Sequence, residues 1–343
     1  MADRAADAPA DRLHAFASGF QATFYVYTGV TTGLFEALTE PRTAAALADT
    51  CELHEPYVRQ FCEAGLRWEL LTVTELTGDA PAFRLDEDFV DVLAVPDAPE
   101  YMGGLFDHLG RHQSEDYRAY PRAFETGEER RFEGRDREFT EAIASSTRGL
   151  HDVFTDHLLS ELSAFDARLS NGGRLVDAGC GAGRLVCRLV SRYPAVEAVG
   201  VDLDEDAVRL ARERADAMDV ADRTTFRVQD AATIDDAVAA AVFFMSLHEI
   251  PPAKRRELFE HLGDVLADDG VVVVFDEIYP DAYDQFSRAP FAAGVETQWA
   301  ELTWGSAVPT SEQYRDLFAA AGCEVQTYRT VADRFIVYEG VIP

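Results

Sequence analysis

A glycine-rich turn is the first place in this chain where residue types and spacing suggest chemistry. The stretch Arg174-Leu-Val-Asp-Ala-Gly-Cys-Gly-Ala-Gly-Arg184 has the pattern of a strand, a tight turn and the start of a helix. The glycines at 179, 181 and 183 let the backbone turn sharply and approach a ligand closely. A helix that begins near Gly183 points its free N–H groups at that ligand, so the turn is a candidate binding site.

The spacing of these glycines argues against a nicotinamide-dependent oxidoreductase. The dinucleotide fingerprint G-x-G-x-x-G needs a glycine at position 184, where this chain has Arg184. The observed spacing is G-x-G-x-G, and Asp177 precedes it. The turn therefore predicts a different nucleoside ligand.

Two further acids end the next two predicted strands. Asp202 ends the run Ala198-Val-Gly-Val-Asp202, and Asp230 ends Phe226-Arg-Val-Gln-Asp230. A carboxylate at the end of such a strand can accept hydrogen bonds from both hydroxyls of a ribose. The alternative is that Asp202 or Asp230 only caps the segment that follows, and Asp204 competes as the N-cap of the next helix.

Together, the turn and these acids resemble the cofactor motifs of class I S-adenosylmethionine-dependent methyltransferases. In that family the glycine loop passes beside the amino-acid end of the cofactor, and the acid matching Asp230 receives the adenine amino group. The resemblance implies S-adenosyl-L-methionine as the cofactor. It also implies the cofactor-binding residues, which are Asp177, Gly179, Gly181, Gly183, Asp202, Asp230 and Ala231.

A histidine follows the fourth predicted strand, in Phe243-Phe-Met-Ser-Leu-His-Glu-Ile250. This segment resembles the Leu-His-Asp-Trp segment of small-molecule O-methyltransferases of the plant and hydroxyindole type. The resemblance implies that His248 is the general base, with Glu249 in place of the family's Asp and Ile250 in place of the Trp. An imidazole with a pKa of about 6.5 can take a proton from a hydroxyl. The rival interpretation is a neutral, packed histidine at the end of a strand.

The same resemblance implies an acid that orients this histidine, at the end of the fifth strand in Asp276-Glu-Ile-Tyr-Pro280. Asp276 is the better match to this orienting acid, and Glu277 is the second candidate. The predicted methyl acceptor is a small molecule, and a hydroxyl group of that molecule is the predicted site of methylation. Some C-methyltransferases of this two-domain build carry a similar Leu-His-Glu segment, so the enolisable carbon of a 2-oxo acid is the alternative acceptor.

The elements that must position these residues indicate the α/β class. Short apolar runs alternate with helical stretches beyond Asn171-Gly-Gly173, which is typical of a parallel sheet covered on both faces. The resemblance adds a late helix after Thr310 or Ser311, closed by Gly322, and an antiparallel edge. The prediction is a Rossmann-like, mostly parallel seven-stranded sheet. Its expected strands lie near 175–176, 198–201, 225–228, 241–245, 271–275, 324–328 and 334–338.

The first half of the chain is predicted to be mainly helical. Apolar residues at helical spacing cover 13–38, with breaks expected near Gly29 and Gly33. Thr43 is a plausible N-cap, a second helix is expected from Pro56 to about Trp68, and two strands near 70–74 and 82–85 flank the turn at 78–81. The order helix, turn, helix and hairpin predicts a winged helix-turn-helix.

The predicted domains are therefore 1–95, winged-helix-like; 96–170, a helical linker that roofs the substrate pocket; and 171–343, the Rossmann-like catalytic domain. Helices in the middle region are expected to break near Pro121 and between Gly127 and Gly134. By resemblance, the N-terminal domain makes a homodimer. His108 and His112 could share a helix face as metal ligands, but a substrate-facing role is favoured and no metal is predicted.

The charged residues of the chain limit which kinds of molecule it can bind. Asp and Glu number 62 against 31 Lys and Arg, a net charge of −31, and Lys254 is the only lysine. A surface this negative repels phosphate backbones, so nucleic acid is disfavoured as a partner and so is a winged-helix regulator. The spread-out acidity, with Arg preferred to Lys, indicates a high-salt cytoplasm. The alternative is an acidic bacterial enzyme without that adaptation.

The cellular compartment is predicted from other features of the sequence. The five cysteines form an odd set without C-x-x-C spacing, which indicates a reducing compartment and neither a disulfide framework nor a zinc site. The N-terminus does not have the pattern of a secretory signal, and no apolar stretch is of membrane-spanning length. We therefore expect a soluble, cytoplasmic protein.

Overall fold

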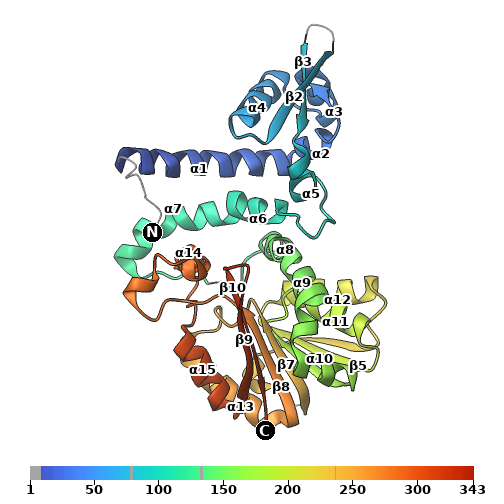
Figure 1. Cartoon of the computed structure of the whole chain (residues 1–343), viewed down its shortest axis with the longest axis vertical. Coiled ribbons are helices and arrows are strands. Elements are labelled where there is room, and N and C mark those ends of the chain that lie inside the picture. The colour runs from blue at the N-terminus through green and yellow to red at the C-terminus, as the bar shows by residue number, and fades with distance from the viewer. Residues whose placement is uncertain (1–8, 78–79, 132–133, 236) are drawn as a thin grey trace. The chain divides into compact units, whose positions relative to one another are not determined.

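A computed structural model describes residues 9–77, 80–131, 134–235 and 237–343 of the chain (Figure 1). The chain forms two compact units. The N-terminal unit comprises residues 1–115 and 145–149, and the C-terminal unit comprises residues 116–144 and 150–343. Gly78 and Asp79 of the predicted hairpin turn, and the first eight residues, lie outside the described ranges.

The C-terminal unit contains a seven-stranded sheet in the order β6-β5-β4-β7-β8-β10-β9. Neighbouring strands from β6 to β8 pair in parallel, whereas β10 is antiparallel to both β8 and β9. The predicted mostly parallel sheet with an antiparallel edge is thus confirmed. The strands are β4 Gly173–Ala178, β5 Val196–Asp202, β6 Thr224–Val228, β7 Val238–Phe244, β8 Leu266–Asp276, β9 Glu324–Val331 and β10 Phe335–Val341.

Helices cover both faces of this sheet (Figure 1). Apolar side chains of α10, α11 and α12 pack in one buried cluster with one face of the sheet, and those of α13 and α15 pack in a second cluster on the other. Every residue of β7 is buried, because the strand lies between the two clusters. These helices are α10 Ser163–Ser170, α11 Arg184–Arg192, α12 Glu205–Ala217, α13 Pro252–Val265 and α15 Ser311–Ala320.

Local capping explains where several helices begin. Thr310 is the N-cap of α15, where its side chain accepts a hydrogen bond from the backbone N–H of Gln313. The Gln313 side chain accepts one from the N–H of Thr310, which completes a capping box. Gly322, with φ of +72°, follows the helix as predicted.

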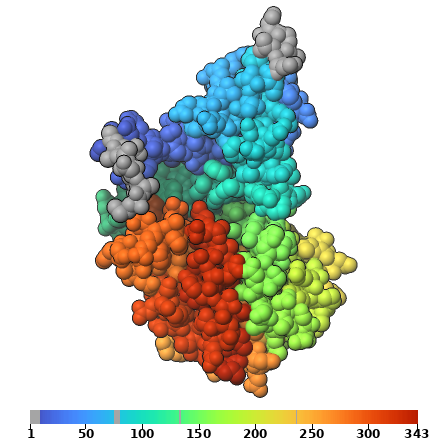
Figure 2. Space-filling view, in the orientation of Figure 1, coloured from blue at the N-terminus to red at the C-terminus, as the bar shows by residue number. Residues whose placement is uncertain are grey.

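The last two strands pack against the helical segment that leads into the sheet. Figure 2 shows these strands, in red, beside the green segment that contains α10. The buried carboxylate of Glu339 in β10 accepts a hydrogen bond of 2.8 Å from the N–H of Phe165 in α10. This bond satisfies an otherwise free N–H in the first turn of the helix.

The N-terminal unit has helices and a small sheet of order β1-β3-β2. Its strands pair antiparallel and include the predicted hairpin, to which the two-residue strand β1 adds a third member. That this unit is a winged helix stays a prediction. Its elements are α1 Pro9–Thr31, α2 Leu34–Ala37, β1 Arg42–Thr43, α3 Ala44–Cys51, α4 Glu55–Arg67, β2 Leu71–Thr77, β3 Ala80–Leu85, α5 Val90–Leu93 and α6 Gly103–His108.

Two expected helix breaks are wrong. Gly29 lies inside α1, where its missing side chain lets the ring of Phe35 pack against the helix, and the break comes at Gly33 with φ of +70°. Pro121 lies inside α7 Ser114–Thr126, which continues past it to the expected break at Gly127. Thr43, in contrast, caps α3 as predicted, by accepting a hydrogen bond from the N–H of Ala46.

The remaining helices are α8 Arg137–Ser146, α9 Arg148–Val153 and α14 Ala292–Ala300, with short 3₁₀ or π-helical segments between several elements. No helix in the described ranges combines the length and the apolar character needed to cross a membrane.

Candidate active site

The glycine turn joins β4 to α11 at the carboxyl edge of the parallel strands. Gly179, Gly181 and Gly183 all have positive φ, at +77°, +49° and +70°. A Cβ atom on Gly179 would lie 2.6 Å from the Cβ of Ser246, so only glycine fits there. The N–H groups of Gly179 and Cys180 donate to the carbonyl of Val201, which fixes the turn against β5.

Asp202 holds the same turn from the end of β5. Its carboxylate accepts hydrogen bonds from the N–H of Gly181 at 2.8 Å and from the N–H of Asp204 at 3.0 Å. Burial raises the pKa of Asp202, and these two N–H donors oppose the shift. A carboxylate has about four acceptor sites, so Asp202 can still accept ribose hydroxyls.

Asp230 and Asp204 both act as caps, the alternative that the sequence had left open. Asp230 accepts a hydrogen bond from the N–H of Ala232, and Asp204 caps α12 through the N–H of Asp206. The second carboxylate oxygen of Asp230 lies 3.5 Å from Nζ of Lys254, the only lysine of the chain. Capping leaves acceptor sites on Asp230, so it does not exclude the predicted role in binding adenine.

A cavity lies over these strand ends. Four of the predicted cofactor residues line it, namely Gly179, Asp202, Asp230 and Ala231. Its other walls come from 249–251, 254, 258, 304–306 and from Glu129 and Arg131. The three remaining predicted residues, Asp177, Gly181 and Gly183, do not line this cavity.

Asp177 is buried below the turn, with 2% of its surface exposed. Burial, followed by the nearby charge of Asp202, raises the pKa of Asp177 to about 8. Its Oδ1 is a buried oxygen without a hydrogen-bond partner among the described residues. An unsatisfied acceptor beside a glycine cradle fits a ligand that carries an ammonium group, such as the amino-acid end of S-adenosylmethionine.

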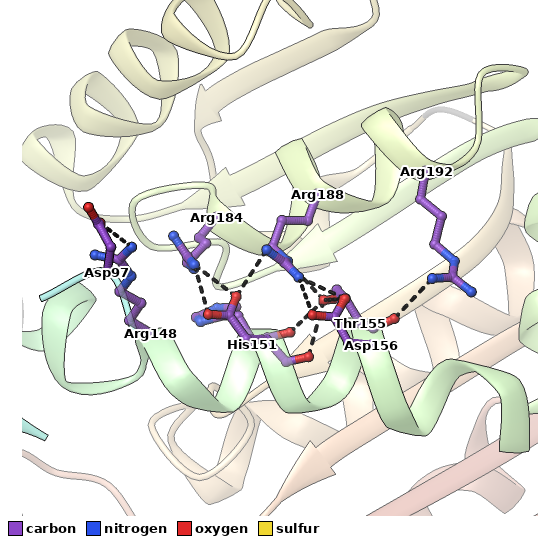
Figure 3. Close-up of polar contacts among 9 residues, drawn as sticks. Asp97, Arg148, His151, Thr155, Asp156, Arg184, Arg188 and Arg192 are labelled. Carbon is purple, nitrogen blue, oxygen red and sulfur yellow. Dashed lines mark hydrogen bonds and ion pairs between the residues drawn. The ribbon is translucent and has the colours of Figure 1, made fainter. Parts of the chain in front are cut away.

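Ion pairs made by two arginines hold α11, the helix that begins at the turn (Figure 3). Arg184 and Arg188 lie on one face of α11 and both form ion pairs with Asp152, at 2.8 and 3.0 Å. Arg188 also pairs with Asp156 at 2.9 Å. Arg184, which excluded the dinucleotide fingerprint, therefore anchors the first turn of the helix and is not among the cavity residues.

His248 lies in the turn after β7 and is 2% exposed. Its Nδ1 lies 2.5 Å from Oδ1 of Asp276 at the end of β8, and its backbone N–H donates to Oδ2 of the same carboxylate at 3.1 Å. The turn that carries His248 is also hydrogen-bonded to the end of β4, since the hydroxyl of Ser246 donates to the carbonyl of Ala178 at 2.6 Å. The structure thus brings His248 and Asp276 together.

Sequence reasoning missed Glu301, which follows α14. Its Oε1 lies 3.7 Å from Nε2 of His248. Burial lowers the pKa of His248, but the charges of Asp276 and Glu301 outweigh burial and hold it well above the ordinary imidazole value. No local motif marks Glu301, because 53 positions separate it from His248 in the chain.

Two more acids, Glu249 and Glu277, lie near His248. Glu277 is buried, with 4% of its surface exposed, and Glu249 is partly buried. Burial raises the pKa of Glu249 well above its ordinary value, and the charge of His248 opposes that shift. Burial raises the pKa of Glu277 to about 7, and His248 opposes that shift too. Glu249 lines the cavity, whereas Glu277 does not.

One cluster in the described ranges has ligand atoms close enough for a metal ion. Single atoms of His248, Glu249 and Glu301 all lie within 4.8 Å of one another. His108 and His112 lie in the N-terminal unit, where their rings stack with centroids 6.0 Å apart. The predicted substrate-facing role of these two histidines stays a prediction.

Comparison with known proteins supports the cofactor site. Residues 175–270, which carry the turn and both strand-end acids, match the family model described as "Methyltransferase domain". Over 323 residues the chain is 27% identical to 3-hydroxy-5-methyl-1-naphthoate 3-O-methyltransferase of Streptomyces sahachiroi, a match that covers 91% of this chain and 89% of that protein.

Solved structures share the fold over nearly the whole chain. An O-methyltransferase family protein from Burkholderia thailandensis has a TM-score of 0.80 at 18% identity, with 98% of each chain covered. Human N-acetylserotonin methyltransferase, solved in complex with S-adenosylmethionine, has a TM-score of 0.77 at 19% identity, with 99% of each chain covered. At these identities the likeness concerns the fold.

The matched domain, the sheet and the strand-end site define this chain as a methyltransferase with the class I, Rossmann-like fold. This domain, with the cavity at its strand ends, fits S-adenosyl-L-methionine as the cofactor.

Proposed function

We propose that this enzyme methylates a hydroxyl of a small molecule, with His248 as the general base. The observation that carries the proposal is the contact of 2.5 Å between Nδ1 of His248 and Asp276. That carboxylate engages one ring nitrogen, so Nε2 is the atom left to accept a proton. The similarity to a protein named as a naphthoate 3-O-methyltransferase supports a hydroxyl acceptor.

The cofactor supplies an electrophilic methyl group when it is bound. His248 accepts the acceptor's hydroxyl proton at Nε2 as the new bond forms, and Asp276 stabilises the resulting imidazolium through Nδ1–H. Asp276 also binds the backbone N–H of His248, so it holds both the ring and the main chain of the base. Most of the acceleration would come from holding the reacting atoms in line, since displacement at a methyl carbon depends strongly on orientation.

We propose the following roles for the cofactor residues. Asp202 accepts the ribose hydroxyls, Asp230 and Ala231 contact the adenine, and Asp177 with the glycine turn holds the amino-acid end. The position of Asp202, Asp230 and Ala231 along one cavity supports these roles. The buried, unpaired oxygen of Asp177 supports an ammonium partner.

The test is His248→Ala in a turnover assay with labelled cofactor and a panel of phenols, catechols and 2-oxo acids. We expect turnover to fall by about 10²–10⁴-fold, the usual contribution of a general base, with binding of S-adenosylhomocysteine retained. Unchanged turnover would remove His248 from the mechanism. Methylation of 2-oxo acids alone would favour the alternative function, removal of a carbon-bound proton, for which the Leu-His-Glu segment also argues.

A chelator separates base catalysis from metal chemistry in the same assay. If Nε2 of His248 receives a proton, EDTA should leave turnover unchanged. Loss of turnover that one divalent metal restores would show that the cluster of His248, Glu249 and Glu301 holds a metal ion instead.

We also propose that the N-terminal unit is a winged-helix-like module that forms a homodimer. Apolar side chains exposed along one helix support this role, since Leu13, Phe16 and Phe20 of α1 are 66%, 66% and 63% exposed. Sedimentation that shows a monomer at micromolar concentration would contradict it.

For the cellular setting we propose a cytoplasm of high salt concentration. The net charge of −31 supports high salt, and the five free cysteines support a reducing compartment.

A further inference from the structure

Asp116 is a fully buried carboxylate in α7, with 0% of its surface exposed. Three side chains donate to it. Arg130 approaches at 2.9 Å, Arg135 at 2.9 and 3.2 Å, and the indole Nε1 of Trp304 at 2.9 Å. The carboxylate is therefore the common partner of two segments that lie about 170 residues apart in the sequence.

Both of these segments line the cofactor cavity. Glu129 and Arg131 come from the first segment, and Trp304, Gly305 and Ser306 come from the second. The residues assigned to the ribose and adenine line the same cavity. The two segments thus form one wall of the site.

This wall has little regular structure to hold it in place. Residues 127–131 and 301–309 belong to no helix or strand. The N–H of Arg130 donates to the carbonyl of Thr303 at 2.6 Å, and Arg135 donates to the carbonyl of Arg130 at 3.0 Å. These bonds run between or within the same two segments that Asp116 joins.

Arg135 adds ring contacts to the ion pair. Its guanidinium carbon lies 4.5 Å from the ring centroid of Phe139 and 5.1 Å from that of Trp304. A cation desolvated against aromatic faces is held more firmly than one on the surface. The indole of Trp304 is therefore fixed both by its N–H bond to Asp116 and by Arg135.

We propose that Asp116 is a positioning residue for cofactor retention, which ties segments 129–131 and 303–306 into a closed wall over the bound S-adenosyl group. Removing its charge leaves two guanidinium groups without their shared anion and replaces one acceptor oxygen by an amide N–H donor that faces other donors, so the wall would open more often. The proposal rests on the cofactor assignment and is independent of the role of His248.

The test measures dissociation of S-adenosylhomocysteine from the purified full-length chain by stopped-flow displacement. Asp116→Asn keeps the shape of the side chain and removes the charge, and we expect dissociation to speed up by about tenfold or more, with association within about threefold of the parent. Trp304→Phe, a milder variant, removes one donor and should speed dissociation in the same direction. The KM for the cofactor should rise more than kcat falls.

Arg137→Ala is the matched control. Arg137 follows the first segment in the chain and forms an ion pair with Glu213 at 3.0 Å, but it does not line the cavity. The rate at which S-adenosylhomocysteine dissociates from Arg137→Ala should stay within about twofold of the rate for the parent. The proposal is overturned if folded Asp116→Asn, or Trp304→Phe when the first variant does not fold, releases S-adenosylhomocysteine as slowly as the parent. Equal acceleration by Arg137→Ala would also overturn it.

Discussion

Charge, more than burial, sets the protonation of His248. Burial opposes a charged imidazole, yet Asp276 and Glu301 together hold the pKa of His248 well above its ordinary value. A base must be neutral before it can accept a proton. The same carboxylates that orient the ring therefore also raise the pH at which it becomes available.

This balance predicts the pH dependence of turnover. A raised pKa keeps His248 protonated at low pH, so log kcat should rise with pH beyond the ordinary imidazole range before it levels off. Glu301→Gln removes one negative charge and should move the rise to lower pH. Glu296→Gln, on exposed surface of the neighbouring α14, should leave the profile in place. A profile that Glu301→Gln does not move would mean that Glu301 has no part in setting this titration.

Asp177 predicts a second, separate pH effect, on stability. Its pKa is raised to about 8 in the folded protein, so the folded state retains a proton that the unfolded chain loses near pH 4. The stability that this proton contributes is complete below the unfolded pKa and is lost as pH rises toward 8.

Asp177→Asn should remove that pH dependence. Without cofactor, we expect its melting temperature to exceed that of the parent by more at pH 9 than at pH 5, by roughly 1–2 °C for each kcal/mol. Asp216→Asn, at an exposed position of α12, is the control and should give the same difference at both pH values. An equal difference for Asp177→Asn at pH 5 and pH 9 would argue against a buried neutral acid.

At the scale of elements, helices are positioned by what they pack against rather than by propensity. Helix α1 contains two glycines in different surroundings. A Cβ on Gly29 would lie 2.3 Å from the ring of Phe35, whereas a Cβ on Gly19 would meet nothing within 4 Å. The sequence predicted a break near Gly29, but the ring of Phe35 makes Gly29 a packing residue inside the helix.

The two positions should respond in opposite directions to alanine. Gly29→Ala should lower the free energy of unfolding by about 1–3 kcal/mol, because the new methyl group displaces a buried ring. Gly19→Ala should raise it by up to about 1 kcal/mol through helix propensity. Urea unfolding of both variants would check this. Stabilisation by both would mean that Phe35 moves aside at little cost.

For the whole molecule, the net charge of −31 is the dominant long-range feature. Like charges destabilise the compact state, and salt screens them, with a screening length of about 10 Å at 0.1 M and about 3 Å at 1 M. We expect the melting temperature to rise by several degrees, roughly 5 °C or more, between 0.1 and 1 M KCl. A melting temperature that stays flat or falls over this range would contradict adaptation to high salt.

Much of the fold follows from local patterns in the chain. Runs of apolar residues between turn signals located the five parallel strands of the large sheet, because strands in a covered parallel sheet are rich in apolar residues. The last two strands, β9 and β10, were expected from the resemblance alone. Turn glycines with positive φ and acids at strand ends located the cofactor edge, since parallel strands bring their carboxyl ends together. The pairing of His248 with Asp276 was expected from the resemblance to the O-methyltransferase segments, and the structure brings the two side chains together.

Long-range packing accounts for what local patterns did not contain. The position of Glu301 beside His248, the uninterrupted helices at Gly29 and Pro121, and the shared contact of Asp116 with Arg130 and Trp304 all depend on residues distant in the chain. Spacing along a sequence reports neighbours within one helix or strand. Which loop meets which strand end is decided when separate elements bury their apolar faces against one another, and the charges near His248 and Asp177 acquire their effect from that burial.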